Sequence, residues 1–212
     1  MTDFEAIEGE IKTGKYRTLA YGNVEGGAYA KCNIFTSDMA EKHWGVKLPR
    51  KKHQTHYNQY SKDQDWPENP MSAAELPKYY EKRADLMGSG VQKVTAKEGR
   101  EIVNNDGLVL MVGLGHATIM APNEKNWPLV YRIHDPWDRV KVGLKDASKY
   151  QFYHISPDDY NKFNAILEQI GLSERDVHAK FGENVSTEWS SDYNSKYELL
   201  HQKLRKSRPQ EY

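Results

Sequence analysis

The sequence predicts an α+β fold from three observations. Apolar residues recur at helical spacing over 32–45, directly after a glycine-rich turn, and Gly45 with Pro49 ends that pattern. Three short apolar runs separated by turn residues follow between 108 and 133, as in an antiparallel meander. Helical patterns resume at Ser156. We therefore expect an N-terminal helix packed on an antiparallel sheet, followed by C-terminal helices.

Length and composition limit the classes of protein that the chain can be. Its 212 residues are enough for a single domain over 1–212. Lysine plus arginine equals aspartate plus glutamate, 30 each, so no global field attracts nucleic acid or an anionic membrane. One cysteine excludes an internal disulfide framework and a cysteine-rich zinc site. No run reaches the length of a membrane span, and the acidic start shows no Sec-type signal. We expect synthesis in the cytoplasm and no cofactor.

The first half of the chain outside the 32–45 helix is weakly patterned. Phe4, Ile7 and Ile11 indicate a short amphipathic helix. Residues 47–90 are rich in lysine, histidine, proline and aromatic residues, and we interpret them as an insertion that walls or lids a groove; a solvated surface excursion is an equal alternative. His53 and His56 have no third ligand at a recognisable spacing, so we expect no metal site.

Cys32 is the first candidate for chemistry. It follows Gly26 and Gly27 and begins the 32–45 helix, where unpaired amides and the helix dipole favour a thiolate. A lone cysteine is more often a small buried hydrophobe. A cysteine nucleophile also needs a base and a group that orients the base.

The meander supplies both partners. Its expected strands are 108–112, 116–120 and 129–133; His116 opens the second, and His134 and Asp135 follow the third. If the second and third strands pair with a register centred near residue 125, His116 lies opposite His134 or Asp135. A carboxylate there can hold one imidazole nitrogen while the other faces the thiol.

The rest of the chain is expected to form strands and helices that pack in the fold and carry no chemistry. Strands are expected over 141–144 and 150–155, and a helix begins with Ser156 as cap and Pro157 in its first turn and ends at Gly171. A second short helix follows from 173, and residues 186–212 form a C-terminal helix and tail.

The motifs around Cys32, Gly115-His116 and His134-Asp135-Pro136-Trp137 resemble the papain-like cysteine peptidase superfamily, and within it the NlpC-type and CHAP amidases of peptidoglycan. The resemblance covers about half of the chain. It implies a papain-like fold in which a nucleophile helix packs on an antiparallel sheet. The long segment between helix and strands, and the lack of an oxyanion glutamine upstream of Cys32, depart from the usual pattern.

The resemblance also implies roles for individual residues. Cys32 would be the nucleophile, His116 the base and Asp135 the group that orients His116. His134 is the competitor for that third role, because alternation puts 134 and 135 on opposite faces. Among the neighbouring side chains, those expected to line the substrate site are Tyr29, Asn33 and His134.

Three functions fit these residues. The first is a cysteine amidohydrolase that cleaves peptidoglycan stem peptides, as an antibacterial effector or phage-type lysin acting in the periplasm or cell wall of a target bacterium, with an immunity protein as its partner. The second is a protease or deamidase of the same chemistry acting on a host protein. The third is a non-enzymatic binding domain in which Cys32 is merely buried. The groove residues, and not the triad, would choose between the first two.

Overall fold

The computed structural model describes residues 2–13, 32–51, 69–70, 76–86, 88–113, 116–123, 127–131 and 141–172, together with 195–196, 198–200 and 202–203. Its helices are α1 (Phe4–Lys12), α2 (Cys32–Trp44), α4 (Leu76–Ala84), α5 (Ala96–Asn104) and α6 (Pro157–Gln169), with a short 3-10 helix, η1 (Ala147–Lys149). Its strands are β1 (Arg50–Lys51), β2 (Asn69–Pro70), β3 (Val91–Val94), β4 (Leu108–Gly113), β5 (His116–Ala121), β6 (Leu129–Tyr131), β7 (Lys141–Gly143) and β8 (Gln151–Ile155).

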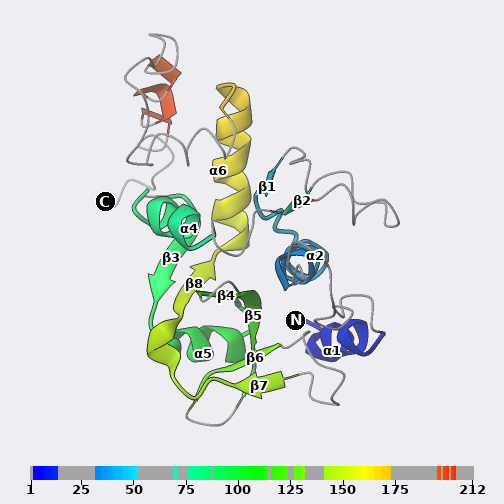
Figure 1. Cartoon of the computed structure of the whole chain (residues 1–212). Helices are drawn as coiled ribbons and strands as arrows, with labels where there is room; N and C mark the ends of the chain where they lie inside the picture. The colour runs from blue at the N-terminus through cyan, green and yellow to red at the C-terminus, as the bar shows by residue number, and fades with distance from the viewer. Residues whose placement is uncertain are drawn as a thin grey trace, which may run out of the picture.

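The mixed α+β class is confirmed, and its centre is a six-stranded sheet of order β3-β8-β4-β5-β6-β7 in which every pairing is antiparallel (Figure 1). Strands β4 to β6 form the expected meander, and β7, expected separately over 141–144, continues it. Strand β8 then returns to the other side of β4 and separates it from β3. A separate two-stranded ladder joins β1 to β2.

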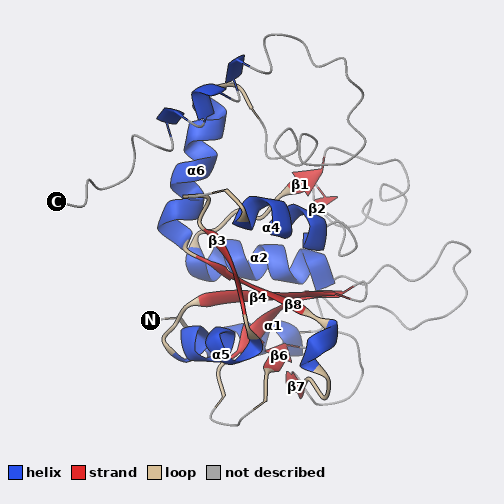
Figure 2. Ribbon diagram, turned by 90° about the vertical axis from the view of Figure 1, so that its left-hand side faces the viewer, coloured by secondary structure: helices blue, strands red, loops and turns tan. Residues whose placement is uncertain are grey.

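The sheet has helices on both faces, which Figure 2 shows edge-on with α2, α4 and α6 on one side and α5 on the other. Alternation along β4 divides the core accordingly. Leu108, Leu110 and Val112 join the buried cluster that includes α2 and α4. Val109 and Met111 join a second cluster under α5. Because both faces are covered, β4 reads as a continuous apolar run and not as an alternating one.

Helix α2 ends as the sequence predicts. Gly45 has φ +66°, a left-handed conformation that favours glycine, and its amide donates to Glu41 O at 3.0 Å. The Val46 amide donates to Ala40 O at 3.1 Å, which satisfies the last turn of the helix. The predicted helix start at Ser156 and Pro157 is also confirmed in α6.

Strand β3 and helix α5 are not predicted from the sequence. The Thr95 hydroxyl caps α5 by accepting from the Glu98 amide, while the Glu98 carboxylate accepts from the Thr95 amide, which makes a capping box. The Thr-x-x-Glu spacing of this box is visible in the sequence and is the signal that could have predicted the helix.

Helix α4, from the segment interpreted as an insertion or lid, packs into the core. Its Tyr79, Tyr80 and Arg83 are buried, and the Arg83 guanidinium lies 3.5 Å from the centre of the Tyr160 ring in α6. Residues 52–68 and 71–75 lie outside the described part of the chain, and the lid stays a prediction for them.

Several other expected elements also fall on residues that are not described. They are the helix from 173 and most of the 186–212 segment; within the latter, residues 198–200 are helical and Leu200 is buried in a cluster with Phe163 and Leu167 of α6. Of the helices in the described ranges, none has the length and apolarity that crossing a membrane requires.

Candidate functional site

Cys32 is the first residue of α2, as predicted, and its side chain is buried, with 3% of the residue exposed. The helix packs across β5 and β4, and its buried side chains include Asn33, Phe35 and Met39. The first turn of α2 holds no acidic residue, so no carboxylate there opposes an anion at the helix start.

One buried hydroxyl ties the start of α2 to β5. Thr36 Oγ1 lies 2.7 Å from Cys32 O, one turn back along the helix, and 3.0 Å from Ala117 O in the strand. The hydroxyl has a single proton, so the two carbonyl oxygens share it. Thr36 itself is 1% exposed, and the contact is therefore shielded from water. This contact fixes the first turn of α2 beside the residue that follows His116.

Two opposing effects act on the pKa of the Cys32 thiol. Burial raises the pKa of the Cys32 thiol, and this is the larger effect. Backbone hydrogen bonds from Ala117, from Asn33 and from the amide of Cys32 itself lower the pKa. These backbone groups favour a thiolate, but their effect is smaller than that of burial. In the resting protein the desolvation cost is larger, and the thiol is protonated at neutral pH.

His116 begins β5, as predicted, and pairs with Gly113 across the hairpin between β4 and β5. The Cys32 thiol lies within hydrogen-bond reach of the Ala117 backbone, so it lies one peptide unit from His116. Successive side chains of a strand point to opposite faces of the sheet, so His116 shares a face with Thr118 and Met120. Helix α2 packs on the other face, which carries Ala117. The backbone that follows His116 is thus adjacent to the Cys32 thiol, whereas alternation places the His116 imidazole on the opposite face of the sheet.

The third member of the expected triad falls beyond the described residues. Strands β5 and β6 pair Met120 with Val130 and Ala121 with Leu129, which is the predicted register centred on residue 125. Residues 132–140 are not described, so the choice between Asp135 and His134 stays a prediction. Among the residues expected to line the substrate site, Tyr29 is likewise outside the described ranges, and Asn33 is buried with 5% exposed.

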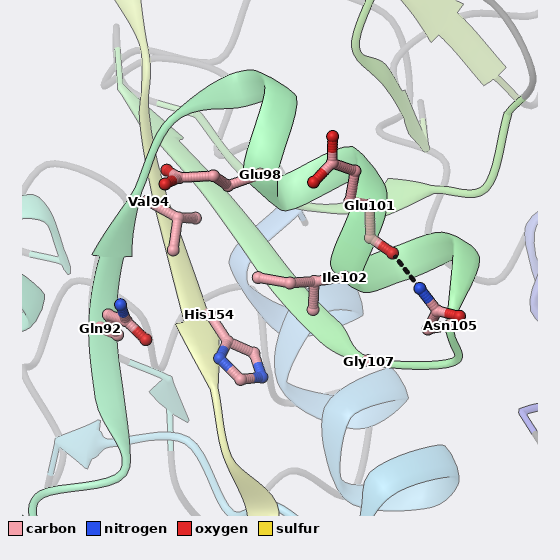
Figure 3. A pocket seen from close by; sticks show the side chains of 8 residues that line it. All are labelled: Gln92, Val94, Glu98, Glu101, Ile102, Asn105, Gly107 and His154. Atoms are coloured by element: carbon pink, nitrogen blue, oxygen red, sulfur yellow. Dashed lines mark hydrogen bonds between the residues drawn. The ribbon is translucent and has the colours of Figure 1, made fainter.

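A groove that the sequence-based analysis missed lies on the other face of the sheet, between β3, β8 and α5 (Figure 3). Its volume is about 480 Å³. The side chains that line it include Gln92, Val94, Glu98, Glu101, Ile102 and His154. These residues were not brought together from the sequence because β3 and α5 were not predicted; the Thr95-x-x-Glu98 spacing is the signal that could have placed Glu98 on a helix. We call this feature the β3 groove.

Within the described ranges, no group of three or more histidine, cysteine, aspartate or glutamate side chains could hold a metal ion. His53 and His56 lie outside those ranges. Comparison with protein-family models, with curated proteins and with solved structures found no match to this chain.

Proposed function

We propose that the protein is a cysteine hydrolase that cleaves amide bonds, with Cys32 as nucleophile and His116 as base, and that its substrate is the stem peptide of peptidoglycan. The observation that carries the proposal is the position of the Cys32 sulfur at the N-terminus of α2, within hydrogen-bond reach of the Ala117 backbone next to His116. Peptidoglycan as the substrate rests on the family resemblance alone.

The reaction would proceed by acyl transfer. This step requires the His116 imidazole to reach the α2 face around the start of β5, where His116 is the first residue. There it takes the thiol proton, and the Cys32 sulfur forms a bond to the carbonyl carbon of the substrate amide. The carbon–nitrogen bond breaks, the leaving amine takes the proton back from His116, and water then hydrolyses the thioester to a carboxylic acid. The Cys32 backbone amide, at the N-terminus of α2, would be one donor to the oxyanion of the tetrahedral intermediate. Asp135, or His134 in its place, would fix the imidazole tautomer.

The same chemistry directed at a protein, as a protease or deamidase, is the alternative that shares these residues. A second candidate has its own support: Cys32 is almost fully buried, its pKa is raised, and His116 has the parity of the α5 face. These observations favour a non-enzymatic binding domain in which Cys32 is a core residue.

Digestion of purified peptidoglycan separates these candidates. Wild-type protein, Cys32→Ala, His116→Ala and the matched control His154→Ala would be incubated with the polymer, and products read by mass spectrometry. The proposal predicts new muropeptides from wild type and from the control, and none from the other two. Products from Cys32→Ala would refute the nucleophile. If no variant gives products but Cys32 reacts with a peptide-based acyl probe in a His116-dependent way, the protein-directed alternative replaces the peptidoglycan assignment.

A further inference from the structure

Strand β3 forms one edge of the six-stranded sheet. Its inner edge pairs with β8 in the register Val91–Ile155 to Val94–Phe152, and none of the described residues pairs with its outer edge. An edge strand of this kind presents backbone N–H and C=O groups from alternate residues, and an extended peptide can add to them as a further strand. The β3 groove runs along this strand, with Gln92 and Val94 contributing to its wall.

The side chains of the groove are acidic and apolar. Glu98 and Glu101 project from α5, and none of the lining residues is a lysine or arginine. The Glu98 Oε2 atom accepts from the Thr95 amide at 2.7 Å and from the Thr95 hydroxyl at 2.8 Å. These bonds lower the pKa of Glu98 and hold its carboxylate in one orientation. The exposed Lys97 also lowers the pKa of Glu98, and it is not among the lining residues.

The floor of the groove is compatible with a long side chain that carries a charge at its tip. Val94 and Ile102 supply apolar surface, and His154 lies half-buried between β3 and β4. Burial lowers the pKa of His154, so its imidazole is neutral at neutral pH and does not oppose a cation. Lysine and arginine side chains combine an apolar stem with a cationic head, which is the chemistry that this floor and rim accept.

We propose that an extended basic peptide adds to the outer edge of β3 and that the lysine or arginine side chains on its α5-facing side extend across Val94 into the β3 groove, towards Glu98 and Glu101. The backbone pairing supplies the orientation of the peptide, and the carboxylates select for positive charge. The proposal is independent of any chemistry at Cys32, because the groove lies on the α5 face and α2 packs on the opposite face.

The test uses the full chain and a fluorescein-labelled hexapeptide that alternates valine with lysine, followed by anisotropy at low salt. The comparison peptide has glutamate in place of lysine. Glu98→Gln combined with Glu101→Gln removes both charges, and glutamine at 98 can keep the capping box. Glu168→Gln, on the exposed face of α6, removes a charge elsewhere and is the matched control. We expect the double variant to weaken binding about five- to tenfold, as for two exposed ion pairs, and the control to leave it unchanged.

Two further readouts locate the peptide. Methylating its backbone nitrogens should abolish binding if the peptide pairs with β3, and amide chemical shifts should move at Val91–Val94. The proposal is overturned by equal binding of the acidic peptide, by an unchanged affinity of the double variant, by full binding of the methylated peptide, or by shifts confined to other strands. Failure of the peptidoglycan assay has no bearing on any of these outcomes.

Discussion

Replacing Thr36 with valine tests whether the hydroxyl contact between α2 and β5 holds the candidate site closed. Valine keeps the shape of threonine but removes the proton that Cys32 O and Ala117 O share. The Cys32 carbonyl retains its place in the hydrogen-bond ladder of the helix. The Ala117 carbonyl is the group that loses its partner from α2.

The expected magnitude follows from that single loss. Leaving a buried carbonyl without its hydrogen bond costs about 1–2 kcal/mol. A loss of that size in a domain of this length lowers the melting temperature by about 2–8 °C. The contact joins α2 directly to β5, and it must break when α2 opens locally and exposes the Cys32 sulfur. Its loss therefore lowers the free energy of that opening by the same amount. The population of the open state should therefore rise about 5- to 30-fold.

Thr118→Val is a closely matched control. Thr118 lies in β5 and is buried, as Thr36 is in α2. The Thr118 hydroxyl donates to a backbone carbonyl, Tyr131 O, at 2.8 Å. That bond links β5 to β6 and not to α2. Both variants should lose similar global stability, measured by thermal unfolding. Only Thr36→Val should accelerate alkylation of Cys32 by iodoacetamide under native conditions. Equal acceleration in the two variants, or none in Thr36→Val, would refute the reasoning.

Three further results are expected. Burial raises the pKa of the Cys32 thiol above its ordinary value of 9.0, so the free energy of unfolding should fall as the pH rises beyond that value. Urea midpoints of wild type and Cys32→Ala between pH 7 and 11 test this, and the same pH dependence in both proteins would contradict it. Arg83→Met removes hydrogen bonds to Ser89 O and Tyr160 O and should lower the free energy of unfolding by about 3 kcal/mol, measured in urea. The control Lys78→Met, on the exposed face of α4, should lower it by less than about 0.5 kcal/mol. Gly90→Ala puts a Cβ 2.2 Å from the Tyr160 amide nitrogen at φ +72°, so little folded protein should be recovered; a stability equal to wild type would exclude this close approach.

Local patterns in the sequence were sufficient for the elements that carry the candidate site. The helical spacing from Cys32 to Gly45 predicted α2, and the turn residues between apolar runs predicted the hairpin that begins β5 at His116. The loop centred on residue 125 predicted the pairing of β5 with β6. Each of these features depends on neighbouring residues in the chain, which is why a single sequence could reveal them.

Long-range features could not be predicted in this way. The position of β8 between β3 and β4 depends on which strands bury the most surface together, and no local pattern records it. The segment that contains α4 was interpreted as a lid over a groove or as a surface excursion. Arg83 of α4 is instead buried, and carbonyl oxygens and aromatic rings surround its guanidinium. The burial of Cys32 follows from the same tertiary packing, and it determines the protonation state of the thiol.

The proposed catalytic pair requires Cys32 and His116 to interact through their side chains. The most direct test is the pH titration of the His116 imidazole by NMR, assigned with a His116→Gln variant, in wild type and in Cys32→Ala. The account predicts a second inflection of the His116 resonance at the pH where Cys32 ionises, which disappears in Cys32→Ala, while the His154 resonance shows no such inflection in either protein. A His116 titration that is identical in both proteins would contradict the claim and leave Cys32 as a residue of the core.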